Sequence, residues 1–259
     1  MYHYPIEFIP EGKNSAAYYS ADPPKNLVVF VHGFRGASVE TWNDFANALP
    51  LTPGFCRSDI IYYGYDSMEG QAFDQAADFL AFLDRHSTPR SALRPDNPPV
   101  YEKIIICAHS LGSIVARFAL LESIKAGFAW RKQCKLVLFA PAHNGARVQS
   151  LLMLSLPGFY KVLGSLLMYN RPVIDDLRPG SPALVKLESE TQKYRDTGEA
   201  PILSAQVLHA FGDKVVHNAP FCYDTFCTGN PVRGRSHVSI CKPEMGIYDT
   251  PIQIIEALL

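Results

Sequence analysis

The stretch Lys103-Ile-Ile-Ile-Cys-Ala-His-Ser-Leu-Gly-Ser113 decides the fold of this chain. It begins with a continuous apolar run, which is typical of a strand buried on both faces of a sheet. The run ends at Ser110, and apolar residues at helical spacing follow from Ile114 to Ile124. The pattern therefore predicts a strand, a sharp turn and a helix, with a serine at the turn.

The residues around Ser110 fit a nucleophile elbow, whose pattern is Gly-x-Ser-x-Gly because the turn is too tight for bulky neighbours. Ala108 replaces the first glycine and is also small, whereas Gly112 fills the second position. Ser110 would then be exposed beside a helix N-terminus, where the N–H of Leu111 points at a developing oxyanion. The alternative is that Ser110 only caps the helix, since serine is a good N-cap. The buried run before the serine and the amphipathic helix after it favour the elbow.

Further strands and helices alternate on both sides of this motif. Continuous apolar runs predict strands at 27–31, 60–63, 135–140 and 205–211. Helical spacing predicts helices at 38–49, 73–83 and 251–259. Such alternation is typical of an α/β fold, with a mostly parallel central sheet and helices on both faces. With the serine turn, it predicts an α/β-hydrolase fold, and we expect one domain over residues 1–259.

The interval 146–200 interrupts this alternation. Structureless loops of that length are uncommon in compact domains, so we expect a partly helical lid or cap at the carboxyl edge of the sheet. Its apolar stretch, 151–168, includes Leu154 and Phe159, which we expect to contact the substrate. Ordinary packing between helices explains such a stretch equally well. Transient contact of this lid with a membrane surface is a further expectation.

The run Val31-His32-Gly33-Phe34-Arg35-Gly36 follows the first strong strand. A serine hydrolase needs a second oxyanion donor from a loop that faces the elbow, and the N–H of Phe34 is the candidate. Gly33 would let this loop come close to the serine. A plain glycine-rich turn is the alternative. We expect the side chains of Arg35 and, beside the elbow, His109 to contact the substrate.

A carboxylate is needed after the serine, because the chain order in this fold is serine, acid, histidine. Asp213 follows Gly212 at the end of the strand predicted at 205–211, where it would hold an imidazole. An aspartate in a turn is also a common structural feature. Asp224 is the second candidate, and Asp175 or Asp176 the more distant ones.

His237 is the candidate general base, because it lies well past the acid and before the terminal helix. Imidazole suits proton transfer near neutral pH. His217 is only four residues after Asp213, too close to reach back over the serine. We assign the remaining histidines at this sheet edge to packing or pocket polarity: His32, His109, His143 and His209.

Composition and residue spacing limit the kinds of molecule that we expect this protein to bind. The formal net charge of −1 over 259 residues gives no electrostatic reason to expect nucleic acid. The histidine and cysteine spacings indicate no metal site, and the proposed chemistry needs no cofactor. Pairing of Cys222 with Cys227 stays open. The N-terminus does not resemble a signal peptide and no run of 18 apolar residues occurs, so we expect a cytoplasmic protein; its oligomeric state is not predicted.

The chain resembles the lipase-like branch of the α/β-hydrolase superfamily that includes relatives of the inositol deacylase of glycosylphosphatidylinositol anchors and the serine-active-site-containing proteins. The matching pieces are Val31–Phe34, Thr41–Trp42, Ala108–Gly112, Ala140–Gly145, Asp176–Ser181, Asp213–Val216 and Ser236–Pro243. The resemblance implies ester hydrolysis on lipid-like or other hydrophobic acyl substrates, with Ser110, Asp213 and His237 as the triad. An acyltransferase, a thioesterase or a peptidase would use the same triad. A non-catalytic binding module on the same fold is the remaining alternative.

Overall fold

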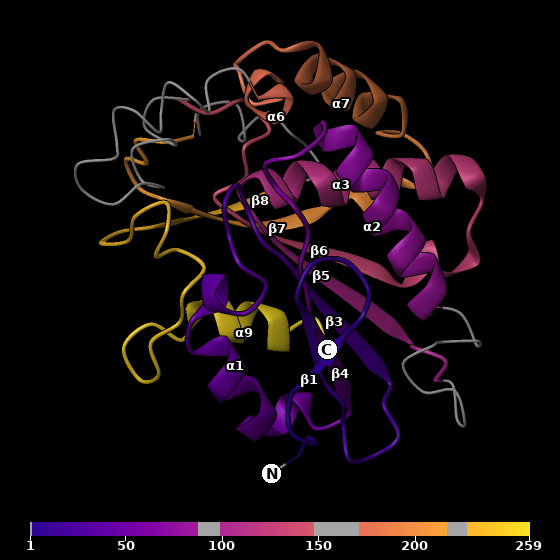
Figure 1. Cartoon of the computed structure of the whole chain (residues 1–259), viewed down its shortest axis with the longest axis vertical. Coiled ribbons are helices and arrows are strands. Elements are labelled where there is room, and N and C mark those ends of the chain that lie inside the picture. Colours follow the sequence, from indigo (N-terminus) through magenta and orange to yellow (C-terminus); the bar gives the residue numbers. More distant parts are fainter. Residues whose placement is uncertain (1, 88–98, 148–170, 217–226) are drawn as a thin grey trace.

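The computed structural model describes residues 2–87, 99–147, 171–216 and 227–259. The strands of these residues form one sheet in the order β1-β2-β4-β3-β5-β6-β7-β8 (Figure 1). Their bounds are β1 Glu7–Ile9, β2 Ser15–Tyr18, β3 Asn26–Val31, β4 Ser58–Tyr63, β5 Lys103–His109, β6 Cys134–Phe139, β7 Ala205–Ala210 and β8 Cys227–Val232.

The sheet is mostly parallel, as the sequence predicts. Strands β3 to β8 pair in parallel with their neighbours, whereas β2 pairs antiparallel with both β1 and β4. The five predicted strands are present as β3 to β7. Because the strands that lead into the site are parallel, their carboxyl ends meet at one edge of the sheet, where ligands bind in open α/β folds.

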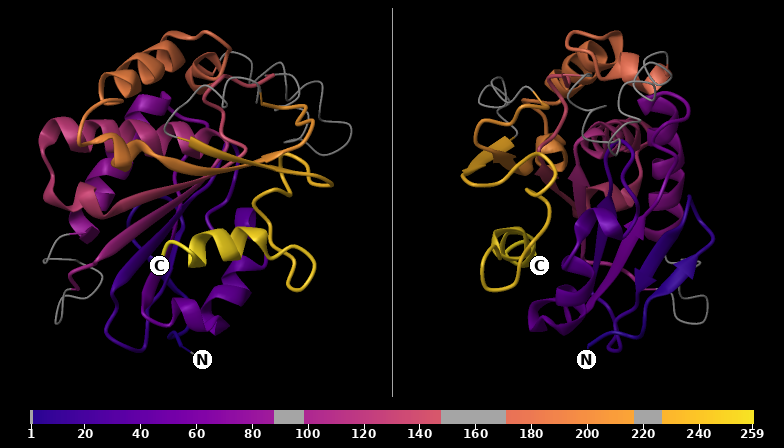
Figure 2. Two further views of the ribbon diagram at one scale, coloured as in Figure 1. Left: turned by 180° about the vertical axis from the view of Figure 1, so that it is seen from behind. Right: turned by 60° about the vertical axis from the view of Figure 1, so that its left-hand side comes forward.

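Helices cover both faces of this sheet (Figures 1 and 2). The helices α2 (Ala72–Ser87) and α3 (Leu111–Ala126) pack on one face, and α1 (Phe45–Ala48) and α9 (Thr250–Glu256) lie on the other. Short 3-10 helices also lie between β3 and β6, at Glu40–Trp42, Leu49–Leu51, Pro53–Phe55 and Ala129–Gln133.

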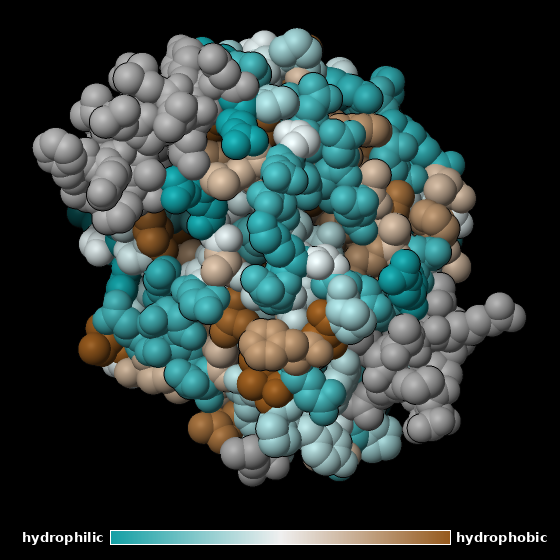
Figure 3. All heavy atoms as spheres, in the orientation of Figure 1, coloured by the Kyte–Doolittle hydropathy of each residue, from teal (hydrophilic) through white to brown (hydrophobic). Residues whose placement is uncertain are grey.

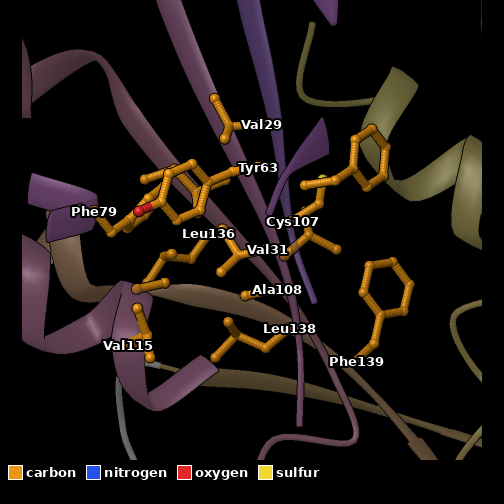
Figure 4. Close-up of a cluster of buried hydrophobic side chains, with 14 of the residues drawn as sticks. Val29, Val31, Tyr63, Phe79, Cys107, Ala108, Val115, Leu136, Leu138 and Phe139 are labelled. Carbon is orange, nitrogen blue, oxygen red and sulfur yellow. The ribbon is translucent and has the colours of Figure 1, made fainter. Parts of the chain in front are cut away.

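The core lies between the central strands and the helices. In Figure 4, Val31 of β3 and Ala108 of β5 lie close to Val115 of α3, while Phe139 of β6 lies on the opposite side of the sheet. These side chains are buried completely, because both faces of β5 and its neighbours are covered. The elbow therefore stands at the end of the most deeply buried strands.

The helix predicted at 38–49 is interrupted. The 3-10 helix Glu40–Trp42 ends at Asn43, whose φ of 50° is incompatible with a right-handed helix, and α1 begins only at Phe45. A second 3-10 helix at Leu49–Leu51 follows. The apolar residues that suggested the long helix are nevertheless buried: Trp42, Phe45 and Leu49.

The predicted insertion is described only in part. Its described residues form α6 (Pro172–Asp176), α7 (Pro182–Lys193) and the start of α8 (Ala200–Leu203). Helix α7 packs against α3. The apolar stretch 151–168, with Leu154 and Phe159, lies outside the described residues, so the lid stays a prediction.

Polar side chains dominate the face shown in Figure 3, with small apolar patches between them. One such patch surrounds the edge strand β1, where Phe8 is 79% exposed. In the described part of the chain, no helix combines the length and the apolar character that crossing a bilayer requires.

Candidate active site

Ser110 occupies a strained turn between β5, which ends at His109, and α3, which begins at Leu111. Its φ of 52° and ψ of −119° are rarely adopted by residues other than glycine. The turn is tight because α3 starts directly against the end of β3. A Cβ atom on Gly112 would lie only 2.4 Å from the carbonyl oxygen of His32, so glycine is required there. The buried strand and this glycine together hold the serine in place.

A chain of two hydrogen bonds links Ser110, His237 and Asp213. The Ser110 Oγ lies 3.1 Å from Nε2 of His237, and Nδ1 of the same ring lies 3.0 Å from Oδ2 of Asp213. The side chains of His237 and Asp213 are 5% and 0% exposed. A neutral imidazole that donates from Nδ1 to the carboxylate accepts the serine O–H at Nε2, which is the arrangement a general base needs.

Asp213 follows β7 after a turn at Gly212, whose φ is 75°. Its Oδ1 accepts hydrogen bonds from the N–H groups of Val215, at 2.8 Å, and Val216, at 3.3 Å. Burial by itself would raise the pKa of Asp213, but the bond and charge of His237 and these two N–H donors outweigh it and lower that pKa below its usual value. The carboxylate is therefore ionised and oriented.

The loop after β3 lies directly against the serine. A Cβ atom on Gly33 would lie 2.9 Å from Cβ of Ser110, so only glycine allows this approach. Among the described residues, the backbone N–H groups of Phe34 and Leu111 have no hydrogen-bond acceptor. These are the two amides that the sequence predicts for an oxyanion hole.

The Gly33–Phe34 peptide is held in one orientation. Its carbonyl oxygen accepts hydrogen bonds from Nδ1 of His32, at 2.9 Å, and from the N–H of Gly36, at 3.0 Å. The N–H of Phe34 belongs to the same planar unit and points the opposite way. Nε2 of His32 in turn accepts the N–H of Tyr65 at 3.2 Å, and the two rings stack. Burial lowers the pKa of His32, which keeps its ring neutral in these two roles.

His109 supports the loop that carries His237. Its Nε2 donates to the carbonyl oxygen of His237 at 2.9 Å. Burial, and then the charge of His237, lower the pKa of His109 to about 3, so its ring is neutral at physiological pH. His109 therefore acts on the candidate base as a fixed hydrogen-bond donor, and it also lines the pocket beside Ser110.

A pocket of about 380 Å³ opens over Ser110 and His237. Arg35 and His109 line it, and their contact with the substrate stays a prediction. Lys242 lines it too, and sequence reasoning missed this residue although it stands in the same turn as His237. A larger hollow, of about 690 Å³, lies at the amino ends of β6 and β7 and contains none of the candidate catalytic residues.

Asp175 and Asp176 do not approach His237, because each has another partner. The Asp176 carboxylate accepts the N–H of Ala72, and Asp175 pairs with Arg178. Asp224 lies outside the described residues, as do His217 and Cys222. Within the part of the chain that the structure describes, no three side chains of the metal-binding kind are grouped as a metal site.

Residues 21–139 match the sequence family described as "Putative serine esterase (DUF676)", and no curated protein matches the chain. The mature lipase BlEst2 of Bacillus licheniformis is 18% identical, with 92% of this chain and 93% of that chain covered and a TM-score of 0.61. A fungal esterase from Rhizomucor miehei is 14% identical, with 99% and 82% covered and a TM-score of 0.66. Est1E of Butyrivibrio proteoclasticus is 17% identical, with 97% and 94% covered and a TM-score of 0.53. At such identities the solved structures show the α/β-hydrolase fold alone, and the family match, which covers less than half of the chain, supports ester hydrolysis.

Proposed function

We propose that the chain is a serine hydrolase that cleaves carboxylic esters with a hydrophobic or lipid-like acyl group, through Ser110, His237 and Asp213. The observation that carries the proposal is the hydrogen-bonded chain from the Ser110 Oγ through His237 to Asp213, which begins at a strained turn on the wall of a pocket. Strain of this kind persists where the surrounding structure enforces it, and it is common at active sites.

In the first half of the reaction, the Ser110 Oγ attacks the ester carbonyl while Nε2 of His237 takes the serine proton. The carbonyl oxygen becomes an oxyanion, which the N–H groups of Phe34 and Leu111 stabilise. The proton on His237 then passes to the leaving alcohol, and the acyl group stays on the serine as an ester. Asp213 holds the ring in the tautomer that can accept the proton and stabilises the imidazolium.

In the second half, water takes the place of the alcohol. Nε2 of His237 removes a proton from the water, the hydroxide attacks the acyl-enzyme, and the same two amides hold the second oxyanion. The proton returns to the Ser110 Oγ as the carboxylic acid leaves. Every proton in this sequence moves between His237 and a group at the serine, so no further acid or base is needed.

The substrate class rests on the pocket and on the family match. Apolar parts of Phe34, Ala37 and Val238 line the pocket beside Ser110. Such apolar walls favour a hydrophobic acyl chain next to the reacting carbonyl. Leu154 and Phe159, which lie outside the described residues, remain predicted contacts for the same chain.

The test is hydrolysis of p-nitrophenyl esters from acetate to palmitate by the wild type, Ser110→Ala and Ser113→Ala. Removal of the nucleophile should lower kcat by about 10⁶-fold, to the level of background. Ser113 is the matched control, because it lies in the first turn of α3, just after Ser110, and its buried hydroxyl bonds to no acceptor among the described residues. Thermal melting of each variant shows that it is folded. A Ser110→Ala variant with wild-type turnover, or a fluorophosphonate that fails to label the wild type, would overturn the proposal.

A further inference from the structure

The turn after His237 fixes the position of Lys242. The N–H of Lys242 donates to the carbonyl oxygen of Ser239 at 3.1 Å. The preceding Cys241 is buried, and its Sγ lies 3.6 Å from the carbonyl oxygen of Thr41. These contacts hold the backbone around Cys241 and Lys242 in place. The Lys242 side chain therefore lines the pocket from the same segment that carries the candidate base.

Lys242 is a cation without a carboxylate partner. It is half-buried, and among the described residues no carboxylate lies within ion-pair distance of its Nζ. Arg131, another partly buried cation, is instead paired: its guanidinium lies 2.6 Å from the Glu199 carboxylate. A partly buried lysine loses part of its hydration, and Lys242 gains no counter-ion among the described residues to offset that loss.

The described residues that line the pocket carry an excess of positive charge. Arg35 and Lys242 are cationic and Glu40 is the single carboxylate among them. The charge of Lys242 extends into the site, since it is one of the influences that lower the pKa of His109, after burial and the charge of His237. An anion in this pocket would be attracted across a partly desolvated space, where charge–charge interactions are stronger than in water.

We propose that Lys242, with Arg35 of the same pocket lining, forms an anion subsite in the catalytic pocket, and that the preferred substrates are esters with a carboxylate or phosphate a few bonds from the scissile carbonyl. This inference rests on the proposed ester hydrolysis at Ser110. The anion belongs either to the acyl part, as in a half-ester of a dicarboxylic acid, or to the alcohol part, as in a phosphorylated glycerol ester. Both would meet the same ammonium group, and the apolar walls would hold the remaining chain.

The test compares two matched pairs of substrates. The first pair is p-nitrophenyl hexanoate and p-nitrophenyl hydrogen adipate, in which a terminal methyl group is replaced by a carboxylate on the acyl side. The second pair is monooleoylglycerol and its phosphate monoester, in which the charge is on the alcohol side. For each pair we measure the ratio of kcat/KM for the anionic ester to kcat/KM for the neutral ester. The pair with a ratio above one identifies the source of the anion.

Lys242→Met should lower the favourable ratio about tenfold, because a charge-assisted hydrogen bond to the anion is lost. Lys242→Arg should retain most of the ratio, and Glu40→Gln should raise it. Lys135→Met is the matched control, since this exposed lysine stands near the amino end of β6, away from the site. A ratio is insensitive to partial loss of folded enzyme, because both esters report on the same sample.

The subsite is overturned where the wild type hydrolyses the neutral esters through Ser110 but prefers neither anionic ester, or where Lys242→Met keeps the wild-type ratio. Failure of the underlying function looks different. The proposed ester hydrolysis fails if the wild type is inert towards all four esters, or if Ser110→Ala is as active as the wild type. In either case the anion subsite is ruled out as well.

Discussion

Two histidines of this chain, His237 and His86, are both buried but differ in the hydrogen bonds of their rings. His237 has both ring nitrogens in hydrogen bonds, with Asp213 at 3.0 Å and the Ser110 Oγ at 3.1 Å. His86, on α2, is fully buried, but neither of its ring nitrogens has a hydrogen-bond partner among the described residues, and the Glu11 carboxylate is 3.7 Å away. Burial lowers the pKa of His86 to about 4. Burial alone thus only makes an imidazole neutral, whereas a general base also needs an oriented carboxylate and a proton donor in reach.

Of the variants that test this comparison between the two histidines, Asp213→Asn should lower the rate most, because it removes the carboxylate that orients His237. In Asp213→Asn the side-chain amide can donate to Nδ1, so the ring of His237 would carry its proton on Nε2 and could no longer accept the serine proton. We expect kcat to fall by about 10⁴-fold, with a much smaller change in KM. Steady-state hydrolysis of p-nitrophenyl butyrate measures this. Asp175→Asn is the control, since the Asp175 carboxylate pairs with Arg178 and does not approach His237. Equal losses in both variants would contradict the assignment of the acid.

A smaller effect is expected at His109, which is a positioning residue. In His109→Leu the carbonyl oxygen of His237 loses its donor, and the loop that carries the base is less well fixed. One buried hydrogen bond corresponds to about a tenfold loss in kcat. In His109→Gln the donor is restored, and kcat should return towards that of the wild type. Should Gln and Leu at this position behave alike, the hydrogen bond to the His237 loop would not matter.

The fold was predictable from sequence where strands are buried on both faces. The continuous apolar runs gave β3 to β7, because those strands lie inside a parallel sheet. The edge strands β1 and β8 and the short β2 carry no such run. β1 exposes two of its three residues, and β8 contains Pro231, which an edge strand tolerates. The interruption at Asn43 was missed too, because the buried apolar side chains on both sides of it keep the helical spacing.

The site was predictable where chain order decides it. Ser110, Asp213 and His237 each stand at a position that the pattern of strands and helices marks, and the structure brings the three within hydrogen-bond distance. The partners of the oxyanion loop were not predictable in this way. Tyr65 reaches His32 only because β4 pairs with β3, and Lys242 reaches the pocket only through the turn after His237. Contacts of this kind depend on tertiary pairing, which no local pattern contains.

His86 gives the most specific prediction, which concerns stability rather than rate. In the unfolded chain this histidine takes up a proton near its ordinary pKa of 6.5, whereas the folded protein resists protonation down to about 4. Between these values the unfolded state binds more protons, so the free energy of unfolding falls as the pH is lowered, by up to about 1.4 kcal/mol per pH unit.

Replacement by leucine removes this linkage and keeps an apolar contact with Phe82, whose ring lies 4.5 Å from that of His86. Urea unfolding of the wild type and His86→Leu at about pH 7 and about pH 4.5 should therefore show a smaller acid-induced loss in the variant. Other buried histidines contribute equally to both proteins, so an identical loss in the two would mean that His86 is protonated in the folded state and that Glu11, at 3.7 Å, holds it as an ion pair.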